Sequence, residues 1–185
     1  MSNYSPPGKE SLSREAALAD CDQSSRDYLL SAFLRQLQAI RLEVEGVRRA
    51  EDIECIHRMR VASRRSRNLL PLMSGCVEEK RLQGWSKQLR GITRALGMAR
   101  DTDVQLDVLV KFEAGLSDRR ARTGIRRLVL RLRQQRAVLQ AELLRVLNKL
   151  EKDNGLQEIE EQAQELIGAA QLNTGQDGMA EALGN

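Results

Sequence analysis

The sequence predicts an all-α protein, an antiparallel bundle of long helices. Leu, Ala, Arg, Gln and Glu, which are strong helix formers, dominate a chain in which aromatic residues make up only 3%. Apolar residues recur at the spacing of amphipathic helices, and alternating runs bounded by turn residues, which would indicate strands, are absent. At 185 residues the chain has the size of one ordinary domain.

The chain divides into three segments. Residues 1–20 lack periodicity and contain two prolines, so they are expected to be a flexible lead-in. Residues 21–152 form the predicted helical bundle. Residues 153–185 are expected to add an acidic amphipathic helix and a tail that contains Gly and Asn.

The first two helices are marked by their ends. One is predicted from Ser24, which forms a capping pair with Asp27, to about Arg49. Acidic residues at 51, 52 and 54 open the next helix, since negative charge suits the positive end of the helix dipole, and Ser74–Gly75 closes it. Pro71 predicts a kink or an early stop near its end.

The remaining helices are separated by glycines. A third helix is predicted over 78–96 and ends at Gly97, and a fourth begins near Asp101 or at Thr102, which has capping-box spacing to Gln105. Residues 115–118 break that pattern. A long helix follows over 119–151, and after residues 154–155 an acidic helical stretch reaches about residue 170.

Charge is divided unevenly along the chain. Residues 1–55 have a balance of −3, residues 56–149 of +14 and residues 150–185 of −7, which together give the net charge of +4. A basic middle between acidic ends indicates an anionic partner for the middle segment. Most of its basic residues are Arg, which binds phosphate oxygens in a bidentate manner and always stays charged.

One arginine-rich helix carries the main candidate site. His57, Arg60, Arg64 and Arg67 fall within an arc of roughly 80° on one side of it. No carboxylate occurs between residues 55 and 77, so these like charges need a compensating anion such as a phosphate polymer. Similar stripes follow, and all three stripes are predicted to line a common groove: Lys87, Arg90 and Arg94, then Arg119, Arg122, Arg126 and Arg133. The alternative is that each stripe is a solvated helix face.

Catalysis and metal binding find little support in the sequence. His57 is the only histidine, so no metal site is predicted. Asp101 and Asp103 are interpreted as a cap or as salt-bridge partners of arginines rather than as acid/base or magnesium groups. No nucleophile elbow, phosphate-binding loop or dinucleotide-binding turn is present. The chain is therefore expected not to be an enzyme and to need no cofactor.

Cysteines and apolar runs indicate the compartment. The three cysteines are odd in number and contain no C-x-x-C pair, which favours reduced thiols. The N-terminus has no apolar core of a signal peptide, and no run approaches the roughly 18 apolar residues of a membrane span. A cytoplasmic protein with no membrane association is predicted.

Two motifs resemble the CHAD family, the conserved histidine α-helical domain. The first is His57-x-x-Arg60-Val61-x-x-Arg64-Arg65-x-Arg67, and the second is Leu96-Gly97-x-x-Arg100-Asp101-x-Asp103-Val104. The match covers about residues 24–150. The resemblance implies a helical bundle that binds inorganic polyphosphate without catalysis and is often associated with polyphosphate granules. The binding residues that it implies are His57, Arg60, Arg64, Arg65, Arg67, Lys87, Arg90, Arg94 and Arg100, with Arg126 and Arg133 less securely placed.

The full family module resembles two similar helical halves, whereas this chain carries only the first His-x-x-Arg helix. Two chains are therefore expected to associate as a homodimer in which their basic faces meet. Two other functions stay open. The first is a nucleic-acid-binding protein, although few aromatics are present to stack on bases, so only non-specific binding is expected. The second is a module that docks another protein through its arginines.

Overall fold

The computed structural model describes residues 22–50 and 52–182, with side chains as far as residue 169. Within these residues the chain forms five α-helices and one 3₁₀ turn, and no strand is assigned there. The elements are α2 (Gln23–Arg49), α3 (Ile53–Leu69), η1 (Leu70–Met73), α4 (Glu79–Gly115), α5 (Arg119–Lys152) and α6 (Gly155–Ala182). The predicted all-α helical bundle is confirmed. The predicted lead-in lies outside the described residues.

Three helices begin at an aspartate whose carboxylate accepts hydrogen bonds from the first turn. Asp22 accepts from the backbone N–H of Ser25 at 3.2 Å, before α2, so this residue caps the helix in place of the predicted Ser24. Asp52 accepts from the N–H of Glu54 at 2.8 Å, and Asp118 caps α5 in the same way. Each aspartate satisfies backbone donors that have no partner within the helix.

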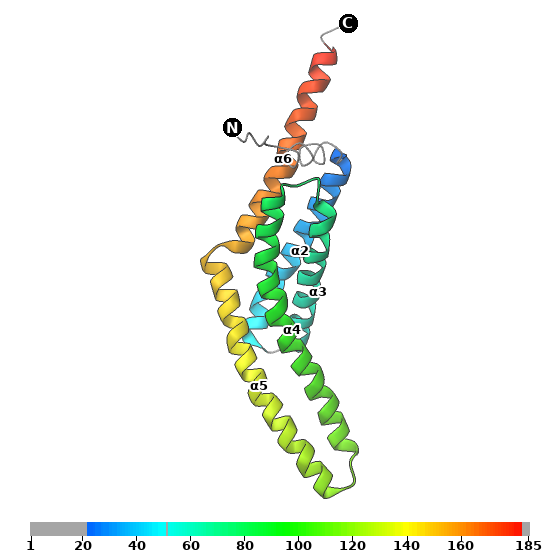
Figure 1. The fold of residues 1–185 in the computed structure, drawn as a ribbon, viewed down its shortest axis with the longest axis vertical. Helices are drawn as coiled ribbons and strands as arrows, with labels where there is room; N and C mark the ends of the chain where they lie inside the picture. The colour runs from blue at the N-terminus through cyan, green and yellow to red at the C-terminus, as the bar shows by residue number, and fades with distance from the viewer. Residues whose placement is uncertain (1–21, 51, 183–185) are drawn as a thin grey trace, which may run out of the picture.

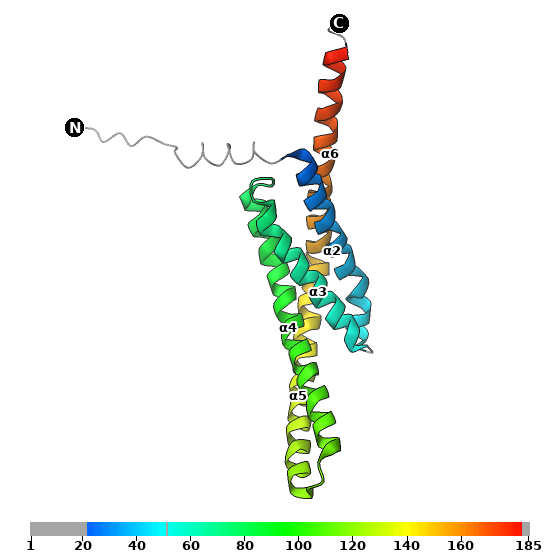
Figure 2. The same cartoon turned by 90° about the vertical axis from the view of Figure 1, so that its right-hand side faces the viewer.

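Helices α2, α3 and α4 pack side by side, α5 runs along α4, and α6 returns onto α2 (Figures 1 and 2). At one end, α4 and α5 extend together beyond α2 and α3 (Figures 1 and 2). This projection is called the arm and comprises residues 101–115 of α4 and 119–135 of α5. The side-chain amide of Gln140 donates to the carbonyl oxygen of Val47 at 2.8 Å, so the arm begins near the end of α2.

The core is mainly aliphatic and includes α6. Phe33 of α2 stacks on Trp85 of α4 with ring centroids 5.2 Å apart, and the indole N–H of Trp85 donates to Gln162 of α6 at 2.8 Å. Ile159 and Ala163 of α6 are buried in the same core. The sequence-based boundary at residue 152 separates these residues from the bundle, whereas burial places them inside it.

Two predicted helix ends are wrong. Helix α4 continues through Gly97, and Thr102 lies inside it, with its hydroxyl donating to the carbonyl oxygen of Met98 at 3.0 Å. Leu96 and Ala99 are fully buried on either side of the glycine. Their burial outweighs the ~1 kcal/mol by which glycine disfavours a helix. Helix α6 likewise runs to Ala182, beyond its predicted end near residue 170.

The cysteines differ from the expected reduced thiols. Cys76 is disulfide-bonded, so the prediction is wrong for this residue. Cys55 is a free thiol buried between α2 and α3. A Cβ atom at Gly46 would collide with the Cys55 sulfur, so the glycine allows these helices to approach closely. Burial raises the pKa of the Cys55 thiol, which stays neutral as a result.

Candidate functional site

The orientation of α3 is shown by the contacts on its two sides. Arg58 points to α2, where its Nε and Nη2 atoms lie 2.6 Å and 2.9 Å from the two carboxylate oxygens of Glu43. At ~100° per residue, Arg60 lies roughly 200° from Arg58, on the side of α3 away from α2. Ser63 and Ser66 are buried, and their hydroxyls donate to carbonyl oxygens of their own helix. The charged stripe of α3 therefore borders α4.

Helices α3 and α4 run antiparallel in a register that two contacts define. Arg100 of α4 lies 3.8 Å from Glu54 at the start of α3. At the other end, Leu70 and Leu82 line one groove. Between these contacts lie the side chains of Arg60, Arg64, Arg67, Lys87, Arg90 and Arg94. These six residues are called the α3–α4 basic face.

The basic residues of α4 lie on the outer side of that helix, next to α3. Arg90 and Arg94 are roughly 80° and 120° round the helix from Arg100, which contacts α3. They lie roughly 140° to 180° from Asp103, which contacts α5. The structure thus brings two of the three predicted stripes to one surface.

The α3–α4 basic face has no acidic neighbours that neutralise it. None of its six side chains forms an ion pair or a hydrogen bond with any part of the chain that the structure describes. Arg41, Arg48 and Arg58, by contrast, each pair with a glutamate. The six charges are therefore available to an external anion.

Three further predicted site residues lie around this face. His57 is half-buried on the same side of α3 as Arg60 and Arg64. Arg100 lies at the end of the face but is already paired with Glu54. Arg65 is exposed and follows Arg64 directly, so it lies ~100° round the helix and off the face.

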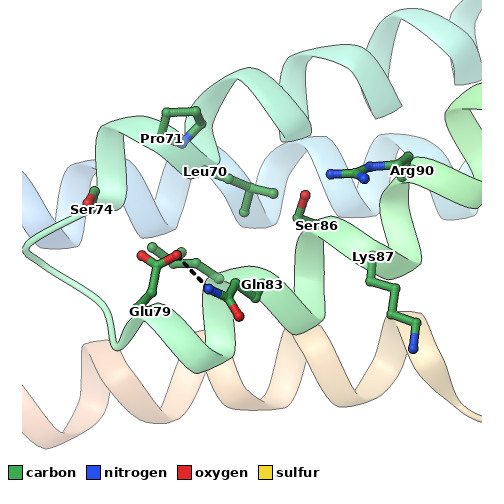
Figure 3. A pocket seen from close by; sticks show the side chains of 9 residues that line it. Leu70, Pro71, Ser74, Glu79, Gln83, Ser86, Lys87 and Arg90 are labelled. Atoms are coloured by element: carbon green, nitrogen blue, oxygen red, sulfur yellow. Dashed lines mark hydrogen bonds between the residues drawn. The ribbon is translucent and has the colours of Figure 1, made fainter.

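A groove of about 670 Å³ continues the face toward η1 (Figure 3). Lys87 and Arg90 line it together with Pro71 and Ser86, and Arg90 extends along the side that faces Leu70 (Figure 3). Glu79 lies farther along and accepts a hydrogen bond from Gln83 at 3.0 Å. Since this carboxylate repels phosphate, it limits the basic surface at that end. The lining residues Pro71, Gln83 and Ser86 were not predicted, because nothing in their pattern distinguishes them from ordinary positions near helix ends.

Arg126 and Arg133 of α5 lie on the arm. Arg126 pairs with Glu113 of α4 at 2.6 Å, and Arg133 is exposed. Helix α5 packs mainly against α4, so its stripe does not border α3. The prediction that three stripes line one groove is wrong for α5, because the face that α5 offers is determined by its packing partner.

The interpretation of Asp103 as a salt-bridge partner is confirmed. Its Oδ1 atom lies 2.7 Å from Nε of Arg136 on α5, and both side chains are largely buried. Asp101 is exposed, and none of the described residues forms an ion pair with it. Among the residues for which side chains are described, no group of three potential ligands is placed to hold a metal ion.

Acid is expected to weaken the α2–α3 contact. The hydrogen bonds from Arg58 hold the pKa of the Glu43 carboxyl below its ordinary value of 4.5. A lowered folded-state pKa contributes stability above the unfolded-state pKa, and this contribution is lost as the pH falls through the folded-state pKa. Arg58→Leu should therefore make the free energy of unfolding less sensitive to acidification below about pH 4.5. Urea unfolding at neutral and acidic pH measures this change in the free energy of unfolding.

Arg35 provides the matched control for that measurement, because it is exposed on α2 and forms no ion pair with the described residues. Arg35→Leu should leave the acid sensitivity as it is in the wild type. If Arg58→Leu and the wild type lose equal stability on acidification, the Glu43–Arg58 pair is not the source of the acid sensitivity.

The fold defines an all-α helical-bundle protein. The family model of the CHAD domain matches residues 31–183, and the chain belongs to this family. The family is associated with polyphosphate binding. No curated protein and no solved structure matches the chain. None of the helices in the described part of the chain combines the length and the apolar character needed to span a bilayer.

Proposed function

We propose that the chain binds inorganic polyphosphate through the α3–α4 basic face and catalyses no reaction. The observation that carries this function is the row of six basic side chains that have no acidic partner in the described residues. Five of the six are arginines, whose planar guanidinium groups match phosphate oxygens. Binding would occur in the cytoplasm, where the polymer also forms granules.

The bound anion would relieve repulsion within the face. Arg60 and Arg64 are four residues apart on α3, and Arg90 and Arg94 have the same spacing on α4. Each like-charged pair at this spacing costs a few tenths of a kcal/mol. A phosphate chain would neutralise both pairs and release its own counterions, so affinity should fall as salt rises.

The shape of the face favours a linear polymer over a single phosphate. Lys87 and Arg100 are separated by a rise of roughly 20 Å along α4. One phosphate would reach only one or two of the side chains on such a row, whereas a chain with charge at every repeat would contact them in succession. The pairing of Arg100 with Glu54 and the position of Glu79 would limit the row at its two ends.

Nucleic acid is the second candidate, since any phosphate backbone is attracted to such a surface. Single-stranded nucleic acid is usually held by aromatic side chains that stack on its bases. Phe33 and Trp85 are buried in the core, Phe112 lies on the arm, and the exposed Tyr28 belongs to α2 rather than to α3 or α4. No aromatic side chain of the described residues therefore lies on the face, which favours polyphosphate.

The experiment is the binding of labelled long-chain polyphosphate, competed by duplex DNA and heparin at matched charge. The double variant Arg60→Ala/Arg64→Ala should lose affinity and preference for polyphosphate. Arg127→Ala/Arg131→Ala removes two exposed arginines from the arm and should retain both. If all three polyanions compete equally and the two variants lose equal affinity, the surface binds any polyanion and has no preference for polyphosphate. A single stoichiometric protein in a pull-down that contains no polyphosphate would instead favour protein docking.

A further inference from the structure

The groove beside η1 changes in character along its length (Figure 3). Four polar residues of α4 fall within an arc of roughly 60° and line the groove in chain order: Glu79, Gln83, Ser86 and Arg90. A carboxylate, an amide, a hydroxyl and a guanidinium group therefore follow one another. Lys87 adds a second cation near Arg90. A ligand that fits this order is polar and uncharged at one end and anionic at the other.

The wall of the groove opposite these residues is largely apolar. Leu70 and Pro71 of η1 line it, and Leu70 points toward α4 (Figure 3). Small-molecule sites have volumes of roughly 300–1,000 Å³ and combine apolar walls with a few convergent polar groups. The groove, at about 670 Å³, lies within this range. Its size and composition therefore fit an organic group as well as phosphate.

Glu79 indicates what kind of organic group the groove fits. The residue is exposed and repels anions, so its end of the groove does not suit phosphate. Its Oε1 atom accepts a hydrogen bond from Gln83 at 3.0 Å, and it forms no ion pair with the described residues. Carboxylates placed in this way bind ribose hydroxyls in dinucleotide-binding folds. The hydroxyls of a sugar therefore match this end of the groove.

We infer that the groove holds the nucleoside of a nucleoside polyphosphate, whose phosphate chain continues along the α3–α4 basic face. This inference rests on the proposed function, since the same basic side chains bind the phosphates. The sugar hydroxyls lie beside Glu79 and Gln83. The base packs against the apolar wall, and the first phosphates reach Arg90. Glu79 and Arg90 are separated by a rise of roughly 16 Å along α4, which leaves room for the nucleoside before the phosphates begin.

A single nucleoside is compatible with the lack of aromatic residues on the α3–α4 basic face. A nucleic acid presents a base at every repeat, and each base needs a surface on which to stack. A nucleoside polyphosphate has one base, which one apolar wall can accommodate. The rest of the ligand is a phosphate chain, which the row of arginines fits.

Calorimetric titration of the full chain with ATP, GTP, UTP and inorganic tripolyphosphate, without divalent cations, tests the inference. Tripolyphosphate has as many phosphates as each nucleotide and more charge, because neither of its ends is esterified. Electrostatic attraction alone therefore favours tripolyphosphate. The groove reverses this order, so at least one nucleotide should bind about tenfold more tightly than tripolyphosphate. If none of the three does, the inference is overturned.

Glu79→Ala distinguishes recognition of the nucleoside from attraction of the phosphates. It should weaken binding of the preferred nucleotide several-fold and leave tripolyphosphate binding equal or tighter, because an acceptor for the sugar and a repelling charge are lost together. Glu78→Ala is the matched control, since Glu78 has the same charge but lines a different cavity with Arg81. It should preserve the ratio of the two affinities. Circular dichroism should show that both variants stay helical.

Two results would contradict the inference or the proposed function separately. If Glu79→Ala strengthens nucleotide and tripolyphosphate binding equally, Glu79 acts only through its charge, and the inference fails while polyphosphate binding by the face can stand. If the nucleotide preference depends on Glu79 but long-chain polyphosphate binds equally well to the wild type and to Arg60→Ala/Arg64→Ala, the proposed function fails and the nucleoside site stands.

Discussion

Replacing Arg60, Arg64, Arg90 and Arg94 together with alanine is expected to weaken polyphosphate binding about a thousandfold. Each guanidinium group would contribute roughly 1 kcal/mol through a charge-assisted contact, and four such contacts correspond to about three powers of ten in affinity. The fold should survive, because none of the four side chains forms an ion pair or a hydrogen bond with the described residues. Removal of the like charges should even relieve repulsion within α3 and α4.

Titration of labelled polyphosphate at several salt concentrations measures both affinity and its salt dependence. The slope of log affinity against log salt should fall by about 0.7 for each phosphate contact removed, as for single-stranded nucleic acids. Arg126→Ala/Arg133→Ala is the informative control, because these two arginines lie on the arm. A comparable slope change in that control would mean that the polymer also follows the arm, and an unchanged slope in the fourfold variant would exclude the α3–α4 basic face as the site.

The largest loss of stability is expected from Arg136→Leu. Asp103 is only 8% exposed in its side chain, and its Oδ1 atom is held by Arg136. Its Oδ2 atom is buried and has no hydrogen-bond partner among the described residues. Without Arg136 the carboxylate would be a buried charge with no compensation, which costs about 3–5 kcal/mol. Arg136 also donates to Gln140 at 3.0 Å, and Gln140 reaches α2, so the change disturbs three helices.

Denaturant unfolding of three variants distinguishes the contribution of the Asp103–Arg136 ion pair from that of the side-chain packing around it. Arg136→Leu should lower the free energy of unfolding, whereas Asp103→Leu/Arg136→Leu should recover most of the loss, since no charge remains buried. Asp107→Leu is the surface control, because Asp107 pairs with Lys111 in an exposed i,i+4 contact and should change little. A double variant as unstable as Arg136→Leu would show that shape, not charge, explains the loss.

Helical periodicity predicted most of the fold, and burial explains where it failed. The long helix α5 begins at Arg119 as predicted and ends at Lys152, one residue later than expected. The predicted stop near Pro71 is confirmed, since the chain changes there from α-helix to the 3₁₀ turn η1. The pattern predicts a helix end at Gly97, because glycine often follows the last residue of a helix. Whether a glycine ends a helix depends on the buried neighbours that hold the chain, and a local pattern does not contain that information.

The candidate site was predictable where it depends on a single helix. The α3 and α4 stripes follow from spacing alone, and the structure places them together. The position of α5 depends on contacts between distant residues, such as Arg136 with Asp103. The sequence therefore showed a third basic stripe without showing that it lies on an arm. The exposure of Val108 on α4 could not be predicted for the same reason.

The contacts of Trp85 make it a natural reporter for the assembly of the bundle. It is the only tryptophan in the chain, and its ring lies against Phe33 while its N–H group bonds to Gln162. Intrinsic fluorescence excited at the indole therefore observes one place where α2, α4 and α6 meet. Detachment of α6 would expose this indole to water and shift its emission to longer wavelength. One spectrum can thus report whether α6 stays attached to α2 and α4.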